Sequence, residues 1–185
     1  VWIPPSVQNR APGSAPARLL QFGHGFFGNR FECDGFPAQL ANEEGFVVVA
    51  ADWWGMSESD RGVVLEKLVN DPANTLLFTD RVHQGMANFL ALGHHAQNSL
   101  LSLPELQIGG EPAYDASALY FYGISMGHIL GGTYVALSPS IDRAVLGVGG
   151  ANFSLMMFRA SPFGPFLALI ALGNDDPLDQ QKFAA

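Results

Sequence analysis

The segment that decides the fold is ALYFYGISMG, residues 118–127. Its first half is an apolar and aromatic run typical of a buried strand, and the small residues that follow, to about Leu137, are typical of a helix. The Gly-x-Ser-x-Gly pattern from Gly123 to Gly127 therefore stands between a strand and a helix, which glycine allows to approach closely. Such a turn points the Ser125 hydroxyl outward at a helix N-terminus, where the helix dipole favours negative charge. Ser125 is therefore the candidate nucleophile.

Three similar apolar runs flank this segment and alternate with helical patterns. A helix ended by Gly45 separates the first two runs, and a long amphipathic helix from Thr75 to about Leu101 follows the second. This alternation predicts an α/β fold: an open parallel sheet with helices on both faces. Ligands of such sheets bind at the carboxyl ends of the strands, where the glycine-rich turns of this chain fall. The predicted strands are 18–22, 46–51, 118–122 and 143–148.

Composition sets limits on the function. The chain has 185 residues, 48% hydrophobic and 14% charged, which is typical of a folded globular domain. Nine Lys and Arg against 17 Asp and Glu give a charge of −8, which repels a phosphate backbone, so we expect no nucleic-acid partner. The single Cys33 cannot close an internal disulfide or supply a cysteine-rich zinc site, and it leaves both cytosolic and oxidising compartments open. No apolar run is long enough to span a bilayer, so we expect no transmembrane segment.

The last part of the chain has a different character. Residues 1–151 hold the sheet pattern, whereas residues 152–185 are rich in Phe and Met and interrupted by Pro. We interpret the second segment as the start of a cap or lid over the site, with core for further sequence as the alternative. The abrupt patterns at residues 1–5 and 178–183 suggest a piece of a longer protein, with a sheet that is incomplete at both ends.

A nucleophilic serine that attacks acyl groups needs backbone N–H donors for the oxyanion that develops on the carbonyl oxygen. The residue after the serine, Met126, offers one N–H. A loop after a neighbouring strand normally offers the other, and GHGFFG at residues 23–28 occupies that place.

These two motifs, together with DWWGMS at residues 52–57, resemble the α/β-hydrolase superfamily over residues 1–151. The resemblance implies an oxyanion hole made by the N–H groups of Phe26 and Met126, with Phe27 as the second choice for Phe26. It also implies that His24 and Gly25 support the loop and that His24 is not the base. More narrowly, the motifs resemble secreted bacterial lipases and esterases of the virulence-factor lipase type, which favours a secreted or periplasmic location and an acyl ester substrate, without cofactor or metal.

The chain departs from the superfamily in its catalytic triad, which runs serine, then acid, then histidine along the sequence. His128 is the only histidine after Ser125, and it lies three residues away on the same helix, where its ring cannot readily reach the hydroxyl. Asp175 and Asp176 are not nominated as the acid, because no strand precedes them. We therefore expect the acid and the base to come from outside these 185 residues.

Other candidate residues have two interpretations each. Asp52 follows a predicted strand at the edge of the sheet where ligands bind. Because it precedes Ser125 in the chain, contrary to the superfamily's order, we interpret it as a turn residue rather than a triad acid. Phe27, Trp53 and Trp54 either line an acyl pocket or belong to the core. The histidines at positions 83, 94 and 95 lie on the long helix and indicate a solvated face rather than a metal site.

The sequence thus supports a serine esterase or lipase, with peptide, thioester and other acyl transfer left open. A non-catalytic binding or assembly module with a hydrolase fold is the alternative, supported by the missing base. Because the fourth predicted strand leaves an open edge, we expect the chain to associate with its own further sequence, a second chain or itself.

Overall fold

The computed structural model describes residues 1–71, 74, 77–173 and 176–184. Its centre is a four-stranded parallel sheet in the order β2-β1-β5-β6, with a short antiparallel hairpin, β3-β4, beside it. The predicted fold class is confirmed, and all four predicted strands are present. The strands are β1 (Ala17–Gly23), β2 (Phe46–Ala50), β3 (Gln107–Ile108), β4 (Glu111–Pro112), β5 (Tyr114–Ile124) and β6 (Ile141–Gly147).

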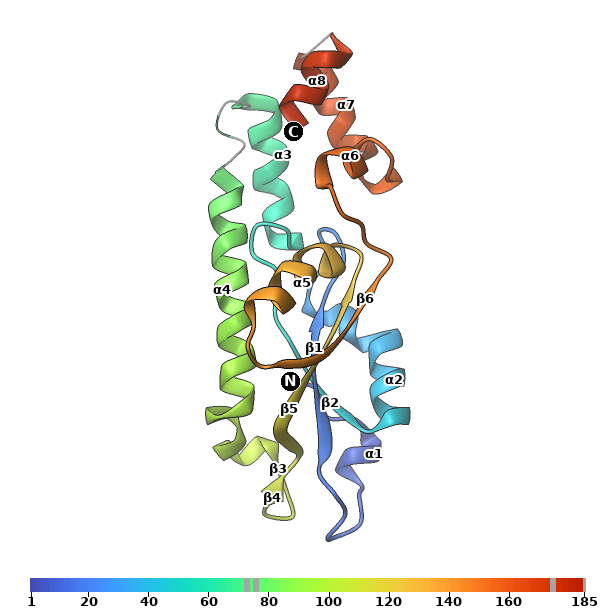
Figure 1. Ribbon diagram of the computed structural model, residues 1–185, viewed down its shortest axis with the longest axis vertical. Helices are drawn as coiled ribbons and strands as arrows, with labels where there is room; N and C mark the ends of the chain where they lie inside the picture. The colour runs from blue at the N-terminus through green and yellow to red at the C-terminus, as the bar shows by residue number, and fades with distance from the viewer. Residues whose placement is uncertain (72–73, 75–76, 174–175, 185) are drawn as a thin grey trace.

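Helices cover both faces of this sheet (Figure 1). Alternate residues of β1 face opposite ways: Leu20 and Phe22 pack in the cluster that α2 covers, whereas Leu19 packs on the side of α4 and α5. Gln21 also faces α4 and α5, and it is fully buried. The helices around the sheet are α1 (Pro5–Gln8), η1 (Arg30–Asp34), α2 (Phe36–Glu44), η2 (Glu58–Asp60), α3 (Arg61–Asn70), α4 (Leu77–Gln97), η4 (Ser99–Ser102), η5 (Pro104–Leu106) and α5 (Met126–Leu137).

Two helical features differ from the sequence prediction. The long helix is shorter than expected, because α4 ends at Gln97 and the chain continues as the separate turn η4; its predicted start at Thr75 lies outside the described residues. Helix α3 was not predicted; of its ten residues, Val64 is the buried one.

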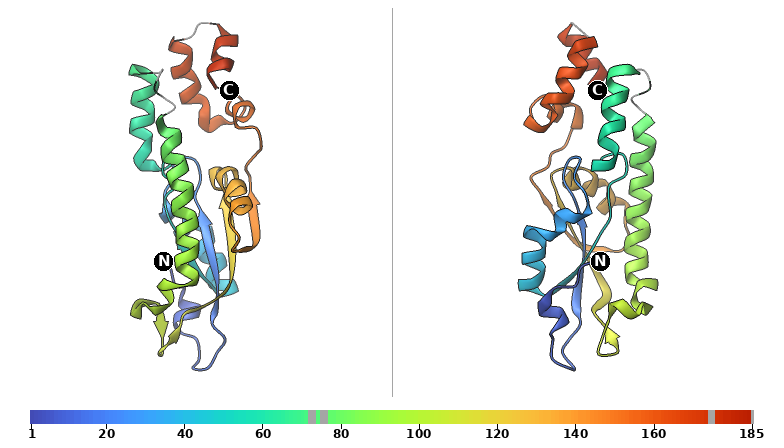
Figure 2. Two further views of the ribbon diagram at one scale, coloured as in Figure 1. Left: turned by 60° about the vertical axis from the view of Figure 1, so that its left-hand side comes forward. Right: turned by 180° about the vertical axis from the view of Figure 1, so that it is seen from behind.

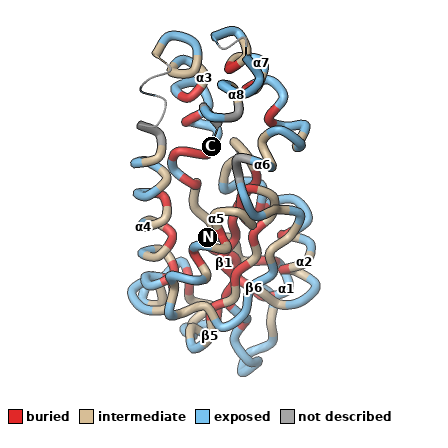
Figure 3. Tube along the Cα trace, turned by 45° about the horizontal axis from the view of Figure 1, so that its top comes forward, coloured by how far each residue is buried: buried red, intermediate tan, exposed pale blue. Residues whose placement is uncertain are grey.

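The chain after β6 forms short helices beyond the carboxyl edge of the sheet, beside α3 (Figure 2). Buried positions concentrate in the sheet and its flanking helices and are sparse in this last segment (Figure 3), where Phe163, Phe166 and Ile170 are the buried hydrophobic residues among those described. The assignment of residues 152–185 to a cap stays a prediction. Its helices are α6 (Phe153–Met157), η6 (Ser161–Phe163), α7 (Gly164–Gly173) and α8 (Pro177–Ala184).

No helix in the described part of the chain combines the length and the hydropathy that a membrane crossing requires.

Buried Asp60 holds the turn after β2 in place. Its Oδ2 accepts hydrogen bonds from the N–H groups of Gly55 and Ser57 and from the Ser57 hydroxyl, and its Oδ1 accepts one from Arg81 Nε on α4 at 2.7 Å. Burial alone raises the pKa of Asp60, but the hydrogen bonds from Ser57 and Arg81 outweigh it and lower the pKa below its usual value. The charged carboxylate therefore stabilises the turn that follows β2 at the carboxyl edge of the sheet.

We expect Asp60→Asn to lower the free energy of unfolding by about 2–4 kcal/mol at pH 7, because it removes the charge that Arg81 and the turn donors face. Since the folded-state pKa is the lower one, the wild-type stabilisation is present above the usual Asp value of 3.8 and is lost as pH falls through the folded-state pKa. Urea unfolding followed by tryptophan fluorescence checks this, with the exposed Asp80→Asn as control. Equal pH slopes below pH 4 in the Asp60 variant and the wild type would contradict it.

Strand β6 is an open edge of the sheet. It pairs with β5 alone among the described residues, and most of its side chains are exposed, including Val145 at 62%. Val148, just beyond its end, is 82% exposed. The opposite edge is partly covered, because Trp2 forms an antiparallel bridge with Val48 of β2. An apolar parallel edge strand with unpaired backbone groups is a template for pairing with another chain.

We therefore expect the 185-residue chain to self-associate through β6 in light scattering. Val145→Lys should shift it toward the monomer, because a charged side chain at an edge disfavours strand pairing. Val63→Lys, at an equally exposed position on α3, serves as the control and should leave the association unchanged. A monodisperse wild-type monomer would refute this expectation.

Candidate active site

Ser125 stands at a strained turn between β5 and α5. Its backbone has φ 55° and ψ −113°, an unusual conformation for a residue other than glycine. Its N–H donates to the Gly147 carbonyl of β6 at 2.9 Å, and its own carbonyl accepts from His128 and Ile129 in the first turn of α5. These bonds hold the strained conformation from both the sheet and the helix.

The two glycines beside Ser125 are required by close packing. A Cβ on Gly123 would lie 2.1 Å from the Gly127 carbonyl oxygen, and a Cβ on Gly127 would lie 2.1 Å from the Gly23 carbonyl oxygen at the end of β1. Any side chain at either position would collide with backbone. The first turn of α5 therefore rests directly on the end of β1.

This packing brings the loop after β1 beside the serine. A Cβ on Gly25 would lie 3.7 Å from Ser125 Cβ. Within the loop, the Gly25 N–H donates to Glu32, the Phe27 N–H donates to the Met56 carbonyl, and the Gly28 N–H donates to the Gly25 carbonyl. Within residues 25–28, the Phe26 N–H is the one that has no hydrogen-bond partner among the described residues.

At the start of α5, the Met126 N–H also has no partner in the described part of the chain, as expected in the first turn of a helix. The N–H groups of Phe26 and Met126 are thus both without a partner in the described structure; the oxyanion role that the sequence assigned to them stays a prediction. Phe27, the second choice, has its N–H occupied by Met56 and a left-handed backbone with φ 48°.

His24 is a fully buried part of the loop's framework. Its Nε2 accepts the Trp53 N–H at 2.8 Å, so the proton resides on Nδ1, which donates to the Gly25 carbonyl at 2.8 Å. Burial lowers the pKa of His24, against smaller opposing effects of Gly25 and nearby carboxylates such as Glu32 and Asp52. Both ring nitrogens are occupied, so His24 joins the β1 loop to the β2 loop as a neutral ring.

The aromatic residues nominated for a pocket lie in different surroundings. Trp53 is 1% exposed and stacks on Phe89 of α4, so the structure places it in the core. Trp54 is 44% exposed, with the Arg81 guanidinium 5.1 Å from its ring centre. Phe27 is half-buried next to the segment after β6.

Four phenylalanines connect the β1 loop with that last segment. The Phe26 ring lies 4.4 Å from Phe163 and 5.4 Å from Phe166, and the Phe27 ring stacks on Phe166 at 5.3 Å. Phe163 and Phe166 are almost fully buried by these contacts. The side chains of Phe26 and Phe27 therefore lie in aromatic, apolar surroundings.

Among the described residues, no histidine ring forms a hydrogen bond with the Ser125 hydroxyl. His128 Nδ1 accepts the Gly149 N–H at 3.0 Å, which fits its interpretation as a partly buried structural histidine. His83, His94 and His95 are exposed on α4, as expected for a solvated face. The described residues contain no group of three or more His, Cys, Asp or Glu that could hold a metal ion.

The acidic candidates have structural partners instead. Asp52 accepts hydrogen bonds from the Arg30 N–H and guanidinium, both at 2.7 Å, which agrees with a turn residue. Asp176 accepts the Leu178 N–H at the start of α8. Asp175 lies outside the described residues.

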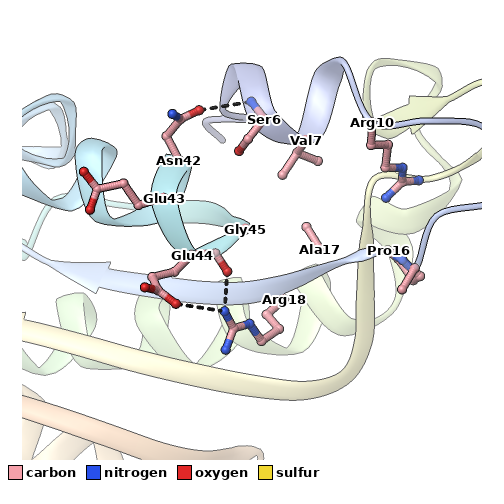
Figure 4. A pocket seen from close by; sticks show the side chains of 11 residues that line it. Ser6, Val7, Arg10, Pro16, Ala17, Arg18, Asn42, Glu43, Glu44 and Gly45 are labelled. Carbon is pink, nitrogen blue, oxygen red and sulfur yellow. Dashed lines mark hydrogen bonds and ion pairs between the residues drawn. The ribbon is translucent and has the colours of Figure 1, made fainter.

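A cavity of about 410 Å³ lies away from Ser125, near the start of β1 between α1 and α2 (Figure 4). Its lining is polar and charged: Arg18 forms an ion pair with Glu44 at 3.7 Å, and Asn42 accepts the Ser6 N–H. Ser125 lies at the carboxyl edge of the sheet, at the other end of β1, so this cavity is not part of the Ser125 site.

Neither a protein-family model nor a curated protein matches the sequence. Solved structures do match. Acetyl xylan esterase 1 from Thermoanaerobacterium sp. JW/SL YS485 aligns with 95% of this chain and 54% of its own, with 15% identity and a TM-score of 0.53. A dienelactone hydrolase structure from Klebsiella pneumoniae aligns with 76% of this chain and 51% of its own, with 19% identity and a TM-score of 0.48. A carboxyl esterase from Bacillus coagulans aligns with 88% of this chain and 44% of its own, with 17% identity and a TM-score of 0.48.

This chain therefore has the α/β-hydrolase fold, as the sequence motifs predicted. It spans about half the length of the solved structures that it matches. At these identities the likeness shows the fold alone.

One polar residue of the site was not found from the sequence. Glu32 on η1 accepts the Gly25 N–H at 2.8 Å, within the loop that flanks Ser125. A glutamate four residues after a glycine-rich turn carries no motif, so its position depends on how η1 folds back toward the loop.

We expect His24→Ala to lower the free energy of unfolding by about 2–3 kcal/mol, because it leaves the buried Trp53 N–H without a partner and removes one of the two donors to the Gly25 carbonyl. Because burial lowers the folded-state pKa of His24, the unfolded chain binds the extra proton first. Wild-type stability should therefore fall as pH drops below the usual value of 6.5. Urea unfolding between pH 5 and 8 checks both effects. His83→Ala is the control and should keep the wild-type slope, whereas a full slope in His24→Ala would count against this assignment.

Proposed function

We propose that this chain carries the nucleophile and the oxyanion hole of a serine hydrolase that cleaves carboxylic esters. The observation that supports it best is the combination of Ser125 in a strained elbow with unpaired N–H groups of Phe26 and Met126 beside it. Backbone strain held by surrounding structure is concentrated at functional sites, and N–H groups aimed at a developing oxyanion supply roughly 3 kcal/mol each.

In the proposed reaction, Ser125 Oγ forms a bond to the ester carbonyl carbon while its proton passes to a general base. The carbonyl oxygen becomes an oxyanion that accepts hydrogen bonds from Phe26 and Met126. Collapse of this intermediate breaks the bond to the alcohol, which leaves with the proton, and water then hydrolyses the acyl-enzyme. Since none of the five histidine rings is hydrogen-bonded to the Ser125 hydroxyl in the described structure, we propose that the base and its acid come from polypeptide outside these 185 residues.

The substrate class follows from the surroundings of the hole. The rings of Phe26, Phe27 and Phe166 are apolar, which favours an apolar acyl group over a charged one. Residues 152–185 act as the cap in this proposal. The fold similarity to esterases supports an ester substrate, while other acyl transfer at the same serine uses the same parts.

A second candidate function is a non-catalytic hydrolase-fold module that binds or assembles with a partner. The observation that favours it is the lack, among the described residues, of a histidine hydrogen-bonded to the Ser125 hydroxyl.

We expect a fluorophosphonate to modify Ser125, detected by intact mass and peptide mapping, and Ser125→Ala to abolish the adduct. Ser14→Ala, in an exposed loop, is the control and should react like the wild type. Added imidazole should speed the labelling several-fold, because it supplies the general base that this chain lacks.

Labelling that persists in Ser125→Ala would contradict the assignment of the nucleophile. No labelling of the wild type, with or without imidazole, would favour the non-catalytic module.

A further inference from the structure

The loop after β1 closes around the carboxylate of Glu32. Glu32 Oε2 accepts the Gly25 N–H at 2.8 Å, and a Cβ on Gly28 would lie 1.7 Å from Glu32 Oε1. A Cβ on Gly25 would lie 3.4 Å from Glu32 Oε2. The loop from Gly25 to Gly28 therefore curves around this carboxylate, and glycine at position 28 leaves room for it.

Glu32 and Ser125 meet the same point of the loop. A Cβ on Gly25 would contact Glu32 Oε2 at 3.4 Å and Ser125 Cβ at 3.7 Å. The carboxylate thus lies against Gly25, the residue before Phe26, at a point that Ser125 also approaches. It takes up the Gly25 N–H, which leaves Phe26 as the N–H of this loop without a partner in the described structure.

Glu32 is presented by a turn that is held at several points. The Asn29 side chain accepts the Phe31 N–H at the start of η1 and donates to Glu58. The neighbouring Arg30 donates twice to Asp52. These bonds connect η1 with the β2 loop, so the carboxylate has a defined position relative to the sheet.

We propose that Glu32 is the positioning residue of the oxyanion loop: by accepting the Gly25 N–H it orients the next peptide so that the Phe26 N–H faces Ser125. It does not touch the reacting atoms. A carboxylate acceptor for a backbone N–H is stronger than a neutral one, which suits a loop that also carries the left-handed Phe27. This inference rests on the proposed function for its catalytic meaning.

The test uses Glu32→Gln, Glu32→Ala and the exposed Glu105→Ala as control, in the full 185-residue chain. The glutamine oxygen can still accept the Gly25 N–H, whereas alanine cannot. Amide hydrogen exchange measured by NMR reports the Gly25 bond without any need for activity. We expect exchange at Gly25 to accelerate about tenfold or more in Glu32→Ala and less than about threefold in the other two variants.

Fluorophosphonate labelling with added imidazole reports the oxyanion hole. We expect the maximal labelling rate of Glu32→Ala to fall by roughly 10²-fold with little change in the reagent concentration for half-saturation, because misplacing a donor affects the transition state more than binding. Glu32→Gln should stay within about threefold of the wild type. Circular dichroism and thermal unfolding show whether each variant folds, and Glu32→Gln keeps the test valid if the alanine variant does not.

Unchanged Gly25 exchange in a folded Glu32→Ala variant would overturn the inference, as would equal slowing of labelling by Gln and Ala. If no variant labels, the wild type included, while Glu32→Ala still accelerates Gly25 exchange, the proposed function fails and the hold of Glu32 on the loop stands.

Discussion

The contact on which the site depends is the one between Gly127 and the Gly23 carbonyl. It sets the first turn of α5 directly on the end of β1, at a distance that leaves no space for a Cβ. Because β1 and β5 are hydrogen-bonded neighbours, this contact also sets the position of the turn at Gly123–Gly127, which carries Ser125, relative to the sheet. The loop after β1 must then pass beside the serine, at Gly25.

A buried polar network holds the two helices of this face in register with the sheet. Gln21 of β1 donates to the Phe89 carbonyl of α4 and accepts the Tyr134 hydroxyl of α5 at 2.6 Å. Burial raises the pKa of Tyr134 to about 12, so its hydroxyl remains a donor over the whole range in which proteins fold. A fully satisfied buried network of this kind favours one arrangement of α4 and α5 on the sheet over others. It therefore complements the contact between Gly127 and Gly23, which positions the turn at Ser125.

The sequence predicted those parts of the molecule that local patterns determine. The strand–glycine–serine–glycine–helix order at residues 118–127 specified the elbow, and the apolar runs specified the four strands. The sequence did not show which of Trp53 and Trp54 is buried, because the direction of each side chain depends on the geometry of the turn. Trp53 stacks on Phe89 in the core, whereas Trp54 is 44% exposed. For a related reason, the sequence did not nominate Glu32. Its hydrogen bond to Gly25 depends on the path of η1 and not on a spacing in the sequence.

The distribution of backbone strain ties the fold to the proposed chemistry. Among the described residues, those other than glycine with a left-handed φ are Phe27, Ser125, Val148 and Asn152. All four lie in the segments that follow β1, β5 and β6, at one edge of the sheet. Each such residue costs of order 1–3 kcal/mol, a cost that glycine at the same position would largely remove. The strain is therefore concentrated where parallel α/β sheets bind ligands, and at position 125 it falls on a side chain that can act as a nucleophile.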